Sequence, residues 1–202
     1  MKIMSFVGSP RKGSNVDLLI DKVIEGAQSK ADVEAEKIYL YEADIKNCNG
    51  CMLCTALKGN KECPIEDEMP GILNRMVSAD AFVFGSPNHC HTMTSAMTNL
   101  WARMMPLNIM EVFRDDSGNI IGGEARSTIK GKKAVIVFSQ GDFSPSASEL
   151  ALRVLSSNVI DFQLRKIGEV FSTGNLERAQ VKDRKEDLKL AFVMGERLTS
   201  SF

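Results

Sequence analysis

The stretch IMSFVGSPRKGSN, residues Ile3–Asn15, decides the fold of this chain. It opens with an apolar run that ends at Gly8, as a strand buried in a parallel sheet does. A polar loop rich in Gly and Ser follows, and residues 16–25 then carry apolar side chains at helical spacing. The first unit of the chain is therefore predicted to be a strand, a loop and a helix.

The loop of this unit has the chemistry of a phosphate site. Backbone N–H groups at the start of a helix are unpaired and carry partial positive charge. Ser9, Ser14 and Asn15 add side-chain donors, and Arg11 adds a full charge. The alternative is a plain strand-to-helix turn with Ser14 or Asn15 as its N-cap. The P-loop and G-x-G-x-x-G patterns are absent, which disfavours a nucleoside triphosphate and a Rossmann-type dinucleotide.

Strands and helices alternate along the rest of the chain. Strands are predicted at 33–40, 81–85, 134–138 and 159–170, and helices at 69–79, 94–104, 146–157 and 181–198. This alternation implies one α/β domain over residues 1–202, a doubly wound five-stranded parallel sheet in the order 2-1-3-4-5. Residues 41–68 are predicted to form a cysteine-rich loop. Residues 106–131 are predicted to be a long excursion that acts as a lid or as an arm between subunits.

Composition excludes several classes of partner. The 202 residues carry a formal net charge of −1 and no basic run, which argues against nucleic acid. No apolar stretch approaches the length of a membrane span. The N-terminal apolar run is too short to be a signal peptide, so a cytoplasmic location is expected. A reducing compartment argues against structural disulfides.

Four of the five cysteines lie within sixteen residues, in the spacing C-x2-C-x2-C-x8-C. They are Cys48, Cys51, Cys54 and Cys63. A cubane iron–sulfur cluster requires a shell of four thiolates, and three cysteines at consecutive x2 spacings wrap one face of such a cluster. Zinc also takes four thiolates, usually from two separate C-x2-C pairs. A redox thiol or disulfide is the third interpretation. The cluster is the favoured one.

Two more strand ends carry small and polar residues. Residues 86–91 follow the strand at 81–85, and Pro87 fixes a turn whose next amides suit a planar ring. Residues 139–142 follow the strand at 134–138. Because the carboxyl ends of parallel strands meet at one edge of a sheet, these loops and the first loop are expected to surround one ligand.

Three motifs together carry a resemblance to a known family. The opening GSPRxGSN of residues 8–15 resembles the signature of the flavodoxin-like NAD(P)H-dependent FMN reductase family. The cysteine motif, with Pro64 and the acidic Glu66–Met69 after it, resembles the iron–sulfur flavoprotein branch of that family. The stretch 79–87, ADAFVFGSP, resembles the strand and turn that hold the flavin ring. The resemblance covers residues 1–105 well and the remainder only through the fold.

The resemblance implies an oxidoreductase that uses FMN together with a 4Fe-4S cluster. It implies ferredoxin or NAD(P)H as electron donor, a small-molecule acceptor, and a homodimer or a homotetramer built as a dimer of dimers. The cluster ligands are expected to be Cys48, Cys51, Cys54 and Cys63. The FMN phosphate is expected at Ser9, Arg11, Ser14, Asn15 and Val16. The flavin ring is expected at Pro87, Asn88 and His89, with the amides near Gln140 and Gly141 tuning it.

The chain departs from the family pattern at four places. His89 stands where the family usually has an aromatic residue. The Lys-x-x-x-Asp-Arg pattern reads Thr98-x-x-x-Ala102-Arg103, so a structural charge pair is expected to be missing. Cys63 arrives after eight residues, later than usual. Cys90 is an alternative ligand, although a buried small hydrophobe is the favoured interpretation of it.

Two other functions stay open. One is a cluster-free NAD(P)H-dependent FMN or quinone reductase. The other is a zinc-bearing or thiol-based redox-sensing module.

Overall fold

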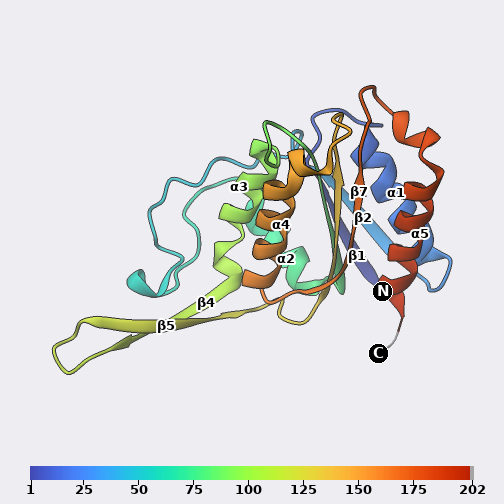
Figure 1. Ribbon diagram of the computed structural model, residues 1–202. Coiled ribbons are helices and arrows are strands. Elements are labelled where there is room, and N and C mark those ends of the chain that lie inside the picture. The colour runs from blue at the N-terminus through green and yellow to red at the C-terminus, as the bar shows by residue number, and fades with distance from the viewer. Residues whose placement is uncertain (201–202) are drawn as a thin grey trace.

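A computed structural model describes residues 1–200 of the chain. Five strands form one parallel sheet in the order β2-β1-β3-β6-β7, which confirms the predicted doubly wound topology (Figure 1). The strands are β1 (Lys2–Val7), β2 (Glu34–Tyr39), β3 (Ala81–Pro87), β6 (Lys133–Ser139) and β7 (Arg165–Ser172).

Helices cover both faces of the sheet. Helices α1 (Asn15–Gln28) and α5 (Lys185–Thr199) lie on one face, and α2 (Met69–Ser78), α3 (Ser95–Arg103) and α4 (Glu149–Asp161) lie on the other (Figure 1). Short 3₁₀ turns precede or follow them at Ala56–Lys58, Met105–Leu107, Pro145–Ser148 and Gln180–Asp183. No helix within residues 1–200 combines the length and the apolar character that crossing a bilayer requires.

The central strands are mostly apolar because each is buried on both faces. Phe6 of β1 stacks on Phe84 of β3 with ring centroids 5.3 Å apart, and Trp101 of α3 packs on Phe84 at 4.3 Å. Burying such an aromatic side chain stabilises the fold by about 1.5–3 kcal/mol. This core fixes α3 against β3, and α3 in turn carries the cysteine loop.

The predicted boundary between α4 and β7 was wrong. A strand was expected over 159–170, but α4 continues to Asp161 and β7 begins only at Arg165. Leu155 and Val159 are both fully buried, four residues apart on one side of α4. The sequence-based prediction therefore assigned Val159, which lies on the buried side of α4, to the strand that follows.

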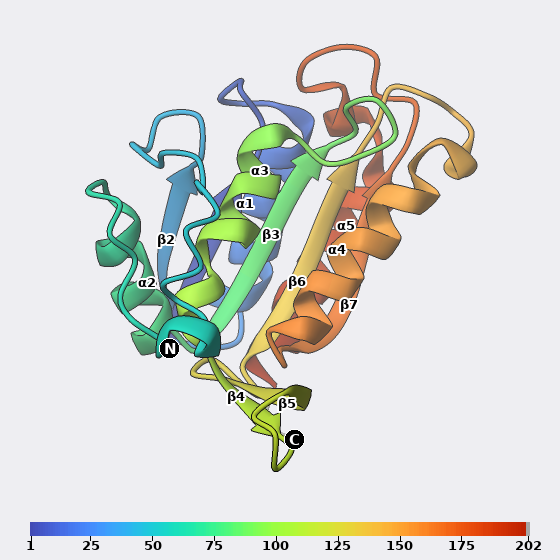
Figure 2. The same cartoon turned by 90° about the vertical axis from the view of Figure 1, so that its left-hand side faces the viewer.

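Residues 106–131 contain a hairpin that the sequence did not reveal. Strands β4 (Asn108–Arg114) and β5 (Ile120–Ser127) pair antiparallel and project from the domain (Figures 1 and 2). Figure 2 shows the hairpin at the amino ends of the sheet strands, opposite the loops that follow β3 and β6. Asn60 of the cysteine loop holds it, because its side chain bonds both the carbonyl and the amide of Met110 at 2.8 and 3.2 Å.

Candidate functional site

The loops at the carboxyl edge of the sheet are tied to one another. The Gly8 amide donates to the Gly85 carbonyl at 2.7 Å, and Thr94 Oγ1 donates to the Gly8 carbonyl at 2.8 Å. A Cβ atom at Gly8 would stand 2.9 Å from the Gly85 oxygen, closer than carbon and oxygen can pack. The first loop and the loop after β3 therefore form one rigid rim.

The first loop is shaped as a helix cap. Ser14 is the N-cap of α1, and its Oγ accepts from the Asp17 amide at 3.3 Å. The amides of Asn15 and Val16, in the first turn of the helix, have no intrahelical acceptor. Arg11 is exposed beside them. These are the groups that an anion binds.

Two of the predicted phosphate residues also serve the loop itself. The Asn15 side chain donates to the Glu177 carbonyl at 2.8 Å and accepts from the Val181 amide at 2.9 Å. Ser9 Oγ exchanges hydrogen bonds of 3.3 Å with the backbone of Arg11. Asn15 therefore offers its backbone amide rather than its side chain.

A buried carboxylate lies under the loop, and a lysine offsets it. Asp17 accepts from the Gly13 amide at 2.7 Å and pairs with Lys37. Burial alone would lower the pKa of Lys37, but its bonds to Asp17 and Asp21 outweigh that effect and raise it. Because the lysine stays charged, Asp17 leaves the positive potential of the helix start largely intact.

The loops after β3 and β6 hold each other through amides. Asn88 donates its amide N–H to the Ser139 carbonyl at 2.8 Å and its side chain to Gln140 Oε1 at 3.3 Å. Gln140 Nε2 donates to the carbonyls of Asp142 and Ser144 at 3.0 and 2.7 Å. Asn88 Oδ1 is buried without a partner among the described residues. An unpaired acceptor in this polar rim is able to accept a hydrogen bond from the N–H of a ligand ring.

His89 opens a tight turn in the loop after β3. Its amide and carbonyl pair with Thr92 at 2.8 and 3.0 Å, and Cys90 and His91 between them have φ values of +50° and +63°. Such left-handed conformations cost non-glycine residues about 1 kcal/mol or more each. Pro87 is half-buried before this turn, and His89 is exposed on it, as is Gly141 in part on the neighbouring loop.

The four clustered cysteines line one cavity of about 190 Å³. It lies between the cysteine loop and the C-terminal end of α3, with Met105, Pro106 and Met110 as part of its apolar wall. Burial raises the pKa of the Cys54 thiol, and the nearby Cys63, Cys48 and Cys51 raise it further. Cys90 lies outside this cavity, on the turn after His89.

The four thiols share this cavity without converging on a point. Within residues 1–200, no three His, Cys, Asp or Glu side chains gather closely enough to hold a metal ion. The donor chemistry nevertheless fits an iron–sulfur cluster, because thiolates are its ligands and the cavity wall is apolar.

A buried ion pair closes the cysteine loop onto α3. Arg103 donates to both carboxylate oxygens of Asp67, at 2.5 and 3.0 Å, and to the Lys46 carbonyl at 2.6 Å. The two side chains are 1% and 0% exposed. The expectation of a missing charge pair was therefore wrong, because Asp67 in the cysteine loop supplies the carboxylate that the helix lacks.

Asn99, one turn earlier on α3, anchors the other end of the loop. It accepts from the Cys48 amide at 3.3 Å and donates to the carbonyls of Ile45 and Lys46 at 3.2 Å. Sequence reasoning missed the roles of Asn99 and Asp67. The only signal was the acidic run around Asp67, and it did not reveal its partner.

An open groove of about 590 Å³ joins the two parts of the site. His89 and Cys48 both line it, and so do Ser95, Asn99 and Ala102, which share one face of α3. The nine residues of α3 rise roughly 13 Å from the edge of the sheet towards the cysteine cavity. The thiols and the loops at the sheet edge thus lie at opposite ends of one helix.

The family model described as NADPH-dependent FMN reductase matches residues 1–171. The chain belongs to this family. This family consists of flavin-dependent oxidoreductases, the class that the resemblance of residues 8–15 indicates.

Curated relatives in the family are named iron-sulfur flavoproteins. One from Methanocaldococcus jannaschii is 31% identical over 121 residues, which are 60% of this chain and 61% of that protein. One from Archaeoglobus fulgidus is 38% identical over half of this chain and 47% of its own length. The chain thus spans about half to three fifths of these two relatives. A second protein from A. fulgidus is 26% identical and matches the whole chain and 80% of its own length.

Solved structures share the fold at low identity. An NAD(P)H:quinone oxidoreductase from Methanothermobacter marburgensis superposes with a TM-score of 0.73 at 16% identity, covering 98% of both chains. An FMN-dependent NADH-azoreductase from Bacillus anthracis, solved with FMN, has a TM-score of 0.69 at 14% identity, covering 98% of this chain and 99% of its own. Both confirm the flavodoxin-like fold predicted from the sequence.

Proposed function

We propose that the chain is an FMN-binding iron–sulfur flavoprotein, an electron-transfer oxidoreductase with FMN and a 4Fe-4S cluster. The observation that carries the proposal is the single cavity lined by Cys48, Cys51, Cys54 and Cys63 on the scaffold of an FMN reductase. A thiol set brought to one cavity by a sixteen-residue loop is the arrangement that cluster binding needs.

The first loop supplies the phosphate site in this proposal. Arg11 offsets the phosphate charge, and the amides of Asn15 and Val16 donate at the start of α1. The hydroxyls of Ser9 and Ser14 lie in the same loop.

The ring site is the rim formed by the loops after β3 and β6. Pro87 and Asn88 shape one side, and the amides near Gln140 and Gly141 shape the other. Asn88 Oδ1 provides the acceptor that has no partner among residues 1–200. His89 is placed at the mouth of the groove that leads to Cys48.

The cysteine cavity supplies the second cofactor site. The four thiolates hold the cluster, and the pair of Arg103 with Asp67 keeps their loop against α3. When bound, FMN supplies one- or two-electron chemistry and the cluster supplies one-electron chemistry. The pairing suits exchange between a one-electron donor such as ferredoxin, or NAD(P)H, and a small-molecule acceptor.

The separation of the two sites along α3 favours an assembly. In a homodimer or homotetramer, the cysteine cavity of one subunit faces the flavin rim of another, and the projecting β4–β5 hairpin is the arm between subunits. Size and mass measurements on the anaerobic protein test this part of the proposal: a monomer at micromolar concentration would contradict it.

The decisive test is anaerobic purification, reconstitution with FMN, iron and sulfide, and quantitation of all three. We expect one FMN and a cubane's complement of iron and sulfide per chain, with both chromophores in the spectrum. A protein that takes up no FMN rejects the flavin claim. One that takes up FMN but no iron rejects the cluster alone, and zinc in place of iron without flavin supports the redox-sensing module.

A variant tests the phosphate site separately. Arg11→Met should weaken FMN binding by about tenfold, roughly 1.4 kcal/mol, because one charge-assisted bond is lost. Riboflavin, which lacks the phosphate, should bind both proteins equally. Lys12→Met is the matched control, since the Lys12 ammonium already pairs with Glu42 at 2.8 Å.

A cluster-free NAD(P)H-dependent FMN or quinone reductase is the second candidate. It is favoured by the absence of any converged metal-binding group within residues 1–200. Steady-state oxidation of NAD(P)H by an iron-free, FMN-loaded sample, at the rate of the iron-containing one, would support it.

A further inference from the structure

One wall of the cysteine cavity contains a positively charged side chain that is not one of the four expected cluster ligands. Arg103 is 2% exposed and lines the cavity together with the four thiols. It also lines an adjoining hollow of about 320 Å³, where Cys63 is again among the lining residues. Arg103 and Cys63 therefore lie together at the boundary of two cavities.

The donors of this guanidinium can be accounted for one by one. Its two terminal nitrogens bond the Asp67 carboxylate and the Lys46 carbonyl. The Nε–H is buried and has no partner among the described residues. Guanidinium offers five N–H donors in a rigid fork, so the carboxylate that holds one side fixes the direction of the rest.

Cys63 is the thiol that lies beside this cation, because both residues line the cysteine cavity and the adjoining hollow. Lys46, another cation in the loop, donates its amine to the Glu66 carbonyl at 2.7 Å. Of the residues that line the cysteine cavity, Arg103 is the only cation.

We propose that, once the cavity holds the cluster, Arg103 donates its Nε–H to the sulfur of Cys63 and thereby sets the reduction potential of the cluster. This inference rests on the proposed function. A donor to a ligand sulfur stabilises the more negative, reduced state, so the potential becomes less negative. Asp67 positions the guanidinium, and Arg103 acts on the cluster through Cys63.

Two variants separate this role from a structural one. Arg103→Lys keeps the positive charge but removes the Nε–H and the fork geometry. Asp67→Asn keeps the Nε–H and removes a nearby negative charge. In EPR-monitored anaerobic redox titrations, Arg103→Lys should shift the cluster midpoint to more negative values and Asp67→Asn to less negative ones. The FMN midpoint of the same samples should stay unchanged.

If the substitutions acted only by loosening the loop, the cluster midpoint would shift in the same direction in both variants. Shifts of opposite sign therefore exclude a purely structural role. A cluster midpoint in Arg103→Lys equal to that of the wild type overturns the proposal. Equal shifts of the same sign in the two variants overturn it as well.

A measurement on the wild type covers the case in which Arg103→Lys holds no cluster. Protein made with arginine labelled at Nε with nitrogen-15 is reconstituted, reduced, and examined by pulsed EPR. A nitrogen-15 coupling to the reduced cluster is expected, and its absence overturns the proposal. A wild type that binds FMN but no iron overturns the cluster and this inference together, whereas a loaded wild type without the coupling overturns this inference alone.

Discussion

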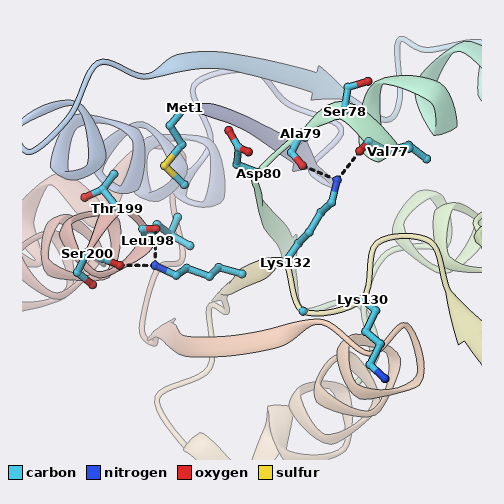
Figure 3. Close-up of a pocket in the computed structure, with 12 residues that line it drawn as sticks. Met1, Val77, Ser78, Ala79, Asp80, Lys130, Lys132, Leu198, Thr199 and Ser200 are labelled. Carbon is cyan, nitrogen blue, oxygen red and sulfur yellow. Dashed lines mark hydrogen bonds between the residues drawn. The ribbon is translucent and has the colours of Figure 1, made fainter. Parts of the chain in front are cut away.

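Two hollows of the molecule differ in whether the charged side chains that line them already have hydrogen-bond partners within the fold. The larger, about 820 Å³, lies at the amino edge of the sheet and carries three lysines, Lys130, Lys132 and Lys133 (Figure 3). The cysteine cavity is far smaller, about 190 Å³. By size and charge alone, the first would be taken for the binding site.

Two of the lysines at the amino edge, Lys132 and Lys133, bond the ends of helices. Lys132 Nζ donates to the carbonyls of Met76, Val77 and Ala79 at the end of α2, which uses all three of its donors. Lys133 Nζ donates to the carbonyls of Leu198 and Ser200 at the end of α5. The last carbonyls of a helix have no intrahelical partner and attract cations.

In the cysteine cavity, the four cysteines form no disulfide, and one guanidinium N–H has no partner within the described residues. The comparison teaches that a site is recognised by chemistry that the fold leaves unused, more than by volume.

Removing one thiol from the cysteine cavity should have the largest effect. Cys63→Ser should lower iron content after anaerobic reconstitution by roughly tenfold or more, because a cluster ligand is lost. The matched control is Cys90→Ser, since Cys90 lies outside the cavity and its loss should leave iron unchanged. If Cys63→Ser kept its iron while Cys90→Ser lost it, the fourth ligand would be Cys90.

Breaking the ion pair beside the cavity should be next. Asp67→Asn leaves the buried Arg103 charge without a counter-ion, which should cost about 3–5 kcal/mol of unfolding free energy. Urea unfolding of the metal-free protein measures it. Glu66→Gln, an exposed neighbour, is the control and should change stability by no more than about 0.5 kcal/mol. A loss in Asp67→Asn as small as in the control would mean that this pair does not fasten the loop.

The elements on which the site is built were predictable because their signals are local. The apolar run before Gly8, the helical spacing after Ser14 and the strand at 81–85 each follow from periodicity. The sheet order follows from the alternation of these units. The four clustered cysteines, which are at most fifteen positions apart, were expected to share a ligand, and they line one cavity.

The parts that could not be predicted depend on long-range partners or weak patterns. Strand β5 is exposed on both faces for most of its length. In β4 the exposed positions include Ile109 and Phe113 while the buried Asn108 is polar, so no alternation of apolar residues marks the hairpin. Asp67 and Arg103 are 36 positions apart, and neither spacing nor composition pairs them. Lys132 reads as the start of a strand, and only the fold shows that it caps α2.

A smaller effect is expected at the amino edge. Lys132→Met removes three bonds to carbonyls, in a partly buried position, and should cost about 1.5–3 kcal/mol by urea unfolding. Lys130→Met, whose side chain is exposed at the same hollow, should be within about 0.5 kcal/mol of the wild type. FMN and iron content should be unchanged in both. Loss of either cofactor in Lys132→Met would place a binding role at this edge and break the contrast.

The dependence of stability on pH should distinguish the two regions most finely. Burial opposes ionisation of Asp67, but the bonds from Arg103 and from the amides of Met69 and Lys46 outweigh it and hold its pKa below the usual 3.8. The unfolded state then binds the proton first, so the contribution of Asp67 is complete above pH 3.8 and is lost as pH falls through the lower folded value. Stability of the metal-free wild type should therefore fall in acid more steeply than that of Asp67→Asn.

Lys132 should affect stability at alkaline pH. Burial lowers its pKa from 10.5, with Asp80 opposing, so on the alkaline side the unfolded state holds the proton that the folded state has released. Stability should rise with pH in that window, and the rise should be absent in Lys132→Met. Denaturant midpoints from pH 3 to pH 11 for the wild type and both variants check the two signs together. An acid response that disappears in Lys132→Met but persists in Asp67→Asn would assign the acid-sensitive contact to the amino edge, and the anchoring of the cysteine loop would need another explanation.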